Sequence, residues 1–82
     1  MTSHDFILRF ALPHPGANPA HFLDALFEAG CDDAVIGIGL PGSVALDFSR
    51  EAESVDVAVR SATEAVMTAI PDAKLTEVRL IP

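Results

Sequence analysis

Residues 34–48 have the sequence AVIGIGLPGSVALDF, which combines two strand-like segments with a turn. The first segment, 34–38, is rich in β-branched residues, which favour extended structure. Pro41 and Gly42 suit the two central positions of a type II turn, because proline restricts φ and glycine accepts a positive φ. Large apolar residues then recur at every second position of 44–48. The stretch therefore predicts a β-hairpin in the middle of the chain.

A strand and a helix are predicted before this hairpin. Large apolar residues alternate with other residues over 5–12, as in a strand with one buried face. Asn18 is a suitable N-cap with Pro19 in the first helical position, and Gly30 is a suitable C-terminal cap. Between these signals, four apolar side chains share one face of the helix: Phe22, Leu23, Leu26 and Phe27.

A second helix and a closing strand are predicted after the hairpin. Ser54 is a suitable N-cap, and Pro71 ends the helix. The apolar residues of this helix follow the helical period at Val55, Val59, Ala62, Val66, Ala69 and Ile70. Residues 74–81 then alternate again. The predicted strand has Thr76, Val78 and Leu80 on one face and Leu75, Glu77, Arg79 and Ile81 on the other.

The predicted order is β-α-β-β-α-β over residues 1–82, and a chain of 82 residues fits one small domain. Short connections fold this order most simply as an α+β, ferredoxin-like domain, with a four-stranded antiparallel sheet and both helices on one face. The first and third strands then lie in the centre of the sheet, and the other two lie at its edges. We therefore expect an outer sheet face that no helix covers.

Charge and cysteine content narrow the classes of function. Twelve acidic and five basic residues give a net charge of −7, which opposes a polyphosphate backbone and favours a protein, a small molecule or a basic partner. The apolar runs are far shorter than the ~20 residues of a membrane span, and the N-terminus lacks the pattern of a secretion signal. A single cysteine excludes an internal disulfide. We expect a cytoplasmic protein that binds no membrane and, by this domain, no nucleic acid.

The outer sheet face is the first candidate site. Its predicted interface residues are Ile7, Arg9, Asp47, Leu75, Glu77, Arg79 and Ile81. The apolar members favour self-association, and the arginines of one copy can meet the acidic residues of a second copy under two-fold symmetry. A domain this small also gains stability from extra burial. The alternative is a solvated face with a cross-strand ion pair between Arg9 and Asp47.

An acidic strip is the second candidate site. Asp24, Glu28 and Asp32 follow one another at four-residue spacing, and no basic residue occurs between Arg9 and Arg50. The strip is either a solvated flank of the first helix or a docking surface for a basic partner. The three histidines are too scattered to form a metal-ligand motif with the acidic residues or the cysteine. We expect no metal site.

No arrangement of residues predicts catalysis or a cofactor. Cys31 follows the C-terminal glycine of the first helix, where the helix dipole raises the pKa of a thiol. A half-buried structural cysteine is therefore expected. The sequence has no nucleophile elbow, no phosphate-binding glycine loop and no His-x-x-x-His pair. We expect a protein that is not an enzyme and holds no cofactor.

Three segments, FEAGCDDA at 27–34, GIGLPG at 37–42 and ALDFSREA at 45–52, resemble an uncharacterised domain of small bacterial regulators. In those regulators the domain precedes a helix-turn-helix, which is absent from this sequence. The resemblance implies association with a regulator and no reaction. It also implies that the chain is either a free-standing relative or the N-terminal portion of something longer.

A weaker likeness is to ACT-type ligand-binding domains, which share this element order and often place Pro-Gly between the first strand and the first helix. Pro15 and Gly16 match that position. The likeness implies a ligand loop at Pro15, Gly16 and Ala17, where backbone N–H groups at the start of the helix would bind the carboxylate of an amino acid.

These patterns lead to one main hypothesis, a non-enzymatic interaction domain that forms a homo-oligomer, most simply a dimer. Such a domain would serve a bacterial regulator or a toxin–antitoxin-like system. Two alternatives stay open at this point. One is an ACT-like amino-acid sensor, and the other is an acidic inhibitor, of the kind that phages encode, which covers a basic partner protein.

Overall fold

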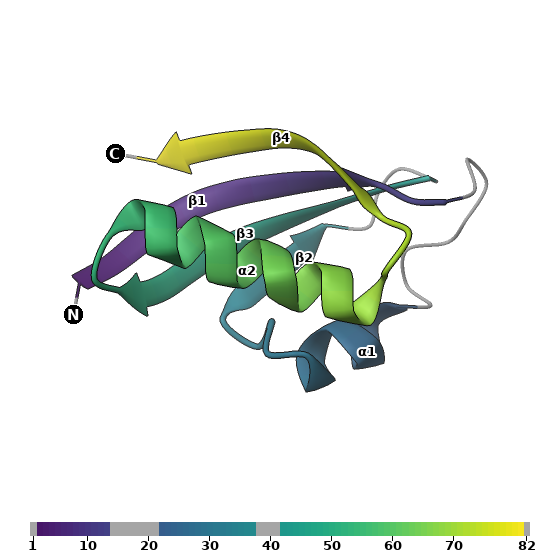
Figure 1. Cartoon of the computed structure of the whole chain (residues 1–82), viewed down its shortest axis with the longest axis horizontal. Coiled ribbons are helices and arrows are strands. Elements are labelled where there is room, and N and C mark those ends of the chain that lie inside the picture. The colour runs from purple at the N-terminus through teal and green to yellow at the C-terminus, as the bar shows by residue number, and fades with distance from the viewer. Residues whose placement is uncertain (1, 14–21, 38–41, 82) are drawn as a thin grey trace.

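The computed structural model describes residues 2–13, 22–37 and 42–81 (Figure 1). Its elements, in chain order, are β1 (Thr2–Ala11), α1 (Leu23–Glu28), β2 (Ala34–Gly37), β3 (Ser43–Ala52), α2 (Val55–Ala69) and β4 (Lys74–Ile81). The strands form one antiparallel sheet in the order β2-β3-β1-β4. The α+β, ferredoxin-like prediction is confirmed, with β1 and β3 in the centre. In the described ranges, no helix is both long enough and apolar enough to cross a membrane.

One face of the sheet carries the core. The core side chains of the two central strands pair directly across them: Phe6 with Phe48, Leu8 with Leu46, and Phe10 with Val44. The rings of Phe6 and Phe48 stack with their centroids 5.3 Å apart. α2 lies across β1 and β3, and α1 packs beside α2 (Figure 1). The alternation of apolar residues predicted these buried faces correctly.

α2 begins where it was predicted but buries a somewhat different stripe. The Ser54 side chain accepts a hydrogen bond from the N–H of Val57 at 3.3 Å, which confirms Ser54 as the N-cap. Val55 and Val59, expected in the buried stripe, are half-buried at its flank. The buried residues of the helix are Ala58, Ala62 and Val66. Because alanine side chains are short, the helix can lie close to the sheet.

α1 is the shorter of the two described helices. It begins at Leu23, with Phe22 as an N-cap that makes no side-chain hydrogen bond. The predicted start signals at Asn18 and Pro19 lie outside the described residues. The ligand-loop residues Pro15, Gly16 and Ala17 and the turn residues 38–41 also lie outside them.

Two glycines have the positive φ that the sequence predicted. Gly30 has a φ of +104°, and the N–H of Cys31 donates to the carbonyl of Leu26 at 3.0 Å, which ends α1 in a Schellman-type cap. Gly42 has a φ of +77°, as the third position of a type II turn requires. The carbonyl of Gly42 accepts a hydrogen bond from the N–H of Leu12 at 2.9 Å, so the start of β3 is tied to the end of β1.

β4 pairs with β1 through an irregular register that the alternation did not predict. Arg9 lies opposite Glu77 and Phe10 lies opposite Leu75, so Thr76 is an extra residue in β4. The Thr76 hydroxyl donates to the carbonyl of Arg9 at 3.1 Å. Since cross-strand partners share a face, Leu75 lies on the helix side with Phe10. The prediction that Leu75 belongs to the outer face is wrong, because it assumed an uninterrupted strand.

Candidate functional site

The predicted interface residues other than Leu75 lie together on the outer face. Two rows cross the strands, Val35, Asp47, Ile7 and Arg79 in one and Gly37, Ala45, Arg9 and Glu77 in the other. Ile81 lies opposite Asp5 at the end of β4. In the part of the chain that the structure describes, both helices lie on the other side of the sheet (Figure 1). The outer face is therefore open to a partner.

The charged residues of the outer face pair at its β4 side. Arg9 Nε donates to Glu77 Oε1 at 3.2 Å, and Arg79 Nη2 donates to Glu77 Oε2 at 3.1 Å. The expected ion pair between Arg9 and Asp47 is wrong, because the register places Ala45 opposite Arg9 and makes Asp47 a diagonal neighbour. Since the paired side chains are well exposed to water, each pair stabilises the fold by at most about 1 kcal/mol.

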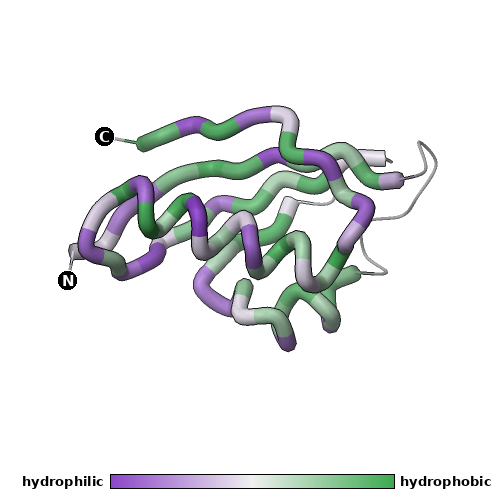
Figure 2. The backbone as a smooth tube through the Cα atoms, in the orientation of Figure 1, coloured by the Kyte–Doolittle hydropathy of each residue, from purple (hydrophilic) through white to green (hydrophobic). Residues whose placement is uncertain are grey.

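β4 differs from the other strands because its apolar side chains are exposed on both faces. The strand runs along the margin of the molecule (Figure 2). On the helix side, Val78 is 43% and Leu80 is 55% exposed, although their β1 partners Leu8 and Phe6 are fully buried. On the outer face, Ile81 is 39% exposed. The cause is the position of α2, which lies across β1 and β3 and leaves β4 uncovered (Figure 1).

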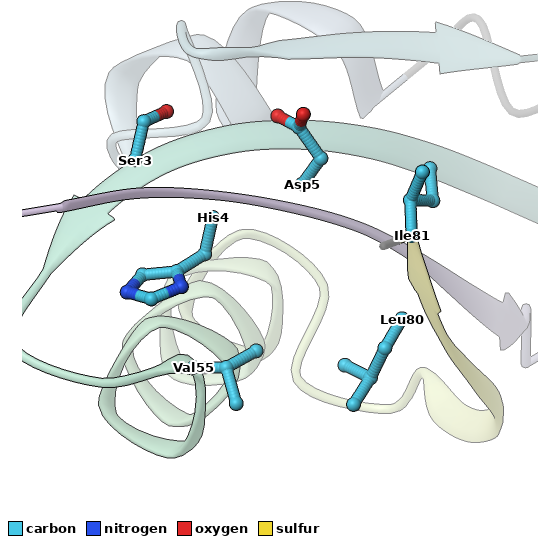
Figure 3. A pocket seen from close by; sticks show the side chains of 6 residues that line it. All are labelled: Ser3, His4, Asp5, Val55, Leu80 and Ile81. Atoms are coloured by element: carbon cyan, nitrogen blue, oxygen red, sulfur yellow. The ribbon is translucent and has the colours of Figure 1, made fainter.

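A shallow hollow of about 460 Å³ lies at the end of β4, where β1 continues past the last residue of β4 (Figure 3). In it, His4 points to the opposite side of β1 from Ser3 and Asp5, as alternate residues of a strand do. Asp5 accepts a hydrogen bond from the Ser49 hydroxyl at 2.7 Å, and His4 Nε2 lies 3.3 Å from the carbonyl oxygen of Ala52. These residues therefore do not form a Ser–His–Asp triad. The lining residues are Ser3, His4, Asp5, Val55, Leu80 and Ile81.

Arg50 forms a hydrogen-bonded cluster that sequence reasoning missed. Its Nε and Nη2 donate to the two carboxylate oxygens of Asp33 at 2.7 and 2.9 Å, and Nη2 also donates to the carbonyl of Gly30 at 2.7 Å. Nη1 donates to the Ser61 hydroxyl at 3.2 Å. The guanidinium lies 5.0 Å from the centroid of the Phe48 ring. The hydrogen bonds with Asp33 raise the pKa of Arg50 above its ordinary value, so the side chain stays charged.

The Arg50 cluster has a structural role. It joins the exit of α1, the strand β3 and the helix α2 through one side chain, and that side chain is only 14% exposed. The available signal in the sequence was that Arg50 is the first basic residue after a long segment without one. Its pairing with Asp33, seventeen positions earlier, depends on how the strands and the α1 exit meet in space.

The predicted acidic strip is exposed in the structure. Asp24 and Glu28 lie one turn apart on α1, and Asp32 lies in the turn that follows the helix. The adjacent Asp33 is neutralised by Arg50, so its charge adds little to the strip. A role in docking a basic partner stays a prediction.

Cys31 is fully buried, whereas the sequence predicted a half-buried cysteine. Burial is the main cause that raises the pKa of the Cys31 thiol above its ordinary value of 9.0, while the nearby Arg50 acts in the opposite direction. Because the thiolate is the reactive form, a thiol that stays protonated is a weak nucleophile. Cys31 therefore serves as a small core residue in this fold.

Neither metal-binding geometry nor a relative identifies the site. Over residues 2–13, 22–37 and 42–81, no three His, Cys, Asp or Glu side chains come together as potential metal ligands. No protein-family model, curated protein or solved structure matches this chain. The interpretation of the site therefore rests on the residues of β4 and the outer face themselves.

Proposed function

We propose that this chain is a protein-interaction domain that self-associates through the β4 side of its sheet and serves a bacterial regulator. The observation that carries the proposal is the exposure of β4. Of the seven large apolar residues that are exposed in the described chain, four lie on this one strand. Exposed apolar residues that gather on one element are typical of a surface that another molecule covers.

The centre of the outer face supports this choice by contrast. There, Ile7 and Ala45 are half-buried by their neighbours, and Arg9 is already paired with Glu77. A partner at the centre would therefore have to desolvate polar groups for little apolar gain. At β4 the same partner would remove Val78 and Leu80 from water, and such burial contributes about 25 cal/mol per Å².

Charge also favours β4 as the meeting point of two copies. The chain has a net charge of −7, which opposes association of any two identical surfaces that carry the average charge. Three of the five basic residues lie on β4 or on the neighbouring strand β1, namely Arg9, Lys74 and Arg79. Two copies that meet at β4 therefore approach through their least acidic side.

The proposal is tested by the mass of the protein in solution as a function of concentration. We expect light scattering to give twice the chain mass of 8.6 kDa at ~0.1 mM and a fall towards one chain near ~1 μM, as for a micromolar dimer. Val78→Lys should remain monomeric, because it places two charges in the interface. The matched control is Val35→Lys on the other edge strand, where the side chain is 76% exposed.

Two results would contradict the proposal. One is a monomer at every concentration. The other is an equal loss of association in Val35→Lys and Val78→Lys, since that would show a dependence on net charge or on the whole sheet and no special role for β4.

A further inference from the structure

We propose that two copies of this chain pair antiparallel through their β4 edges, with Val78 on the two-fold axis. The inference rests on the proposed function, because it assumes self-association and specifies how it occurs. It is carried by the free edge of β4 and by the order of charges along it.

The edge of β4 is suited to strand addition. β4 is the last strand of the sheet order, so one side of its eight-residue backbone has no partner among the described strands. An edge of this length offers a row of N–H and C=O groups that a second strand can satisfy. The other edge strand, β2, offers a row of four residues. The longer edge therefore gains more main-chain hydrogen bonds from a partner.

The charges along β4 select one register. With Val78 opposite Val78 of the second copy, Glu77 of each chain lies opposite Arg79 of the other, and the overlap extends over residues 76–80, up to the extra residue Thr76. Cross-strand pairs of opposite charge stabilise a sheet, whereas like charges placed directly opposite destabilise it. An axis at Glu77 would place two carboxylates opposite each other, and an axis at Arg79 would place two guanidinium groups opposite each other. An axis between two residues would place outer-face residues opposite helix-face residues.

The arginine on β1 extends this pattern across the dimer. Within one chain Glu77 already contacts Arg9 at 3.2 Å. In the paired sheet each Glu77 then lies between Arg9 of its own chain and Arg79 of the second copy. The intrachain contact between Arg79 and Glu77, at 3.1 Å, is replaced by one across the two-fold axis. Each row therefore alternates in sign over Arg9, Glu77 and Arg79 of the second copy, and it ends at Ile7 on β1 of the second copy.

Apolar contacts join the copies on the helix side. Val78, which is 43% exposed in one chain, packs against its own counterpart, and Leu80 lies opposite Thr76 of the second copy. A two-fold axis in an antiparallel strand pair is perpendicular to the sheet, so both α2 helices lie on the same side of the joined sheet. The exposed helix face of β4 then lies between two α2 helices and no longer at a margin.

Disulfide trapping tests the position of the axis. A residue on the axis lies opposite itself, at a Cα separation of about 4.5–5.5 Å, which is within the range that a disulfide can span. We expect Val78→Cys to form a covalent dimer under mild oxidation, as seen on a non-reducing gel. Leu80→Cys is the matched control on the same strand, because two such residues would be separated by about 13 Å along the strands. The wild-type chain should not cross-link through its buried Cys31.

Charge exchange gives an independent test of the register. Glu77→Arg and Arg79→Glu should each weaken dimerisation about tenfold, because each opposes two like-charged pairs across the axis. The double variant Glu77→Arg with Arg79→Glu restores the complementary pairs across the axis and should recover part of the dimerisation, because an arginine at position 77 then lies opposite Arg9 of its own chain. Recovery would show that the single variants lose dimerisation through the pairing of charges and not through misfolding. Urea unfolding of each variant measures its stability directly.

The outcomes separate this inference from the proposed function. A dimer that cross-links through Leu80→Cys or Val35→Cys, but not through Val78→Cys, would overturn the register while self-association stands. A double variant that dimerises as weakly as the single variants would also overturn the register. A wild-type chain that stays monomeric would overturn both, and would indicate that the charges of β4 protect the edge from pairing.

Discussion

The two edge strands of this sheet are built in opposite ways. β2 is four residues long, and Asp33, which precedes it, is held by Arg50 and by a hydrogen bond from the N–H of Ser49 to its carbonyl at 3.1 Å. β4 is twice as long, and its own ion pairs, which join Glu77 to Arg9 and Arg79, are more exposed to water than the pair between Arg50 and Asp33. Natural proteins often protect edges by shortening or covering them. β2 fits that rule, and β4 departs from it.

The two edges differ because the helices cover the sheet unevenly. α2 lies across β1 and β3, and α1 packs against α2 (Figure 1). The core is therefore completed over the central strands and on the side of β2, whereas the helix face of β4 stays exposed. The hydrogen bonds of β4 with β1 hold the strand in place although Val78 and Leu80 are exposed to water. These two side chains are therefore available for binding.

The largest expected effect compares the same substitution on the buried sheet and on the open edge. Leu46→Ala removes a fully buried side chain that lies opposite Leu8 and Ile36, so we expect the free energy of unfolding to fall by ~2–5 kcal/mol. Leu80→Ala removes a side chain that is more than half exposed and should cost under about 1 kcal/mol. Urea unfolding followed by circular dichroism, in dilute samples, measures both. Equal losses would show that β4 is as well packed as the core.

The next effect compares two arginines. Arg50→Ala removes a bidentate contact with Asp33 and leaves that carboxylate without its partner, so we expect a loss of about 2 kcal/mol in the free energy of unfolding. Arg79→Ala removes an exposed contact on β4 and should cost less than about 0.5 kcal/mol. Arg50→Lys should recover only part of the loss, because lysine cannot form the bidentate contact. A small loss of unfolding free energy in Arg50→Ala would contradict the view that Arg50 stabilises the β2 side of the sheet.

The smallest expected effect is a dependence of stability on alkaline pH. Burial raises the folded pKa of the Cys31 thiol above 9.0, so the unfolded chain loses this proton at a lower pH than the folded chain. The stabilisation is fully present below the unfolded pKa and is lost as pH rises through the folded pKa. We expect the free energy of unfolding to fall as pH increases above about 9, and this part of the fall should be absent in Cys31→Ala.

Few side chains other than Cys31 affect the unfolding free energy at alkaline pH. The chain has no tyrosine and a single lysine, Lys74, so few other side chains titrate in the same range. A thiol-reactive reagent gives a second readout, because Cys31 should react slowly in the folded protein. In the variant Leu80→Cys, the new thiol should react fast, because Leu80 is more than half exposed. Fast labelling of Cys31 in the folded protein would contradict its burial in the core.

Local signals predicted the parts of the fold that depend on neighbours in the sequence. Ser54 caps α2 and Gly30 ends α1 because each role involves residues within one or two helical turns. The alternation of large side chains predicted the buried faces of β1 and β3 for the same reason. The predicted outer face was correct at Ile7, Arg9 and Asp47, whose strands are regular.

The errors occurred where residues from different elements meet. The extra residue Thr76 in β4 becomes visible only when β4 is aligned with β1, and it moved Leu75 to the other face of the sheet. The partner of Arg9 is Glu77 on the neighbouring strand and not the predicted Asp47. A sequence pattern contains no register between strands, so neither result was accessible before the structure.

The order of the elements, the buried faces of β1 and β3 and the acidic charge all follow from the amino-acid sequence, because periodicity, capping and composition are properties of the local chain. The contacts of Arg50 at the α1 exit and the position of α2, which leaves β4 uncovered, follow only from the folded structure, because they depend on how elements distant in sequence pack. The exposed edge that we propose as the interface is a result of that packing.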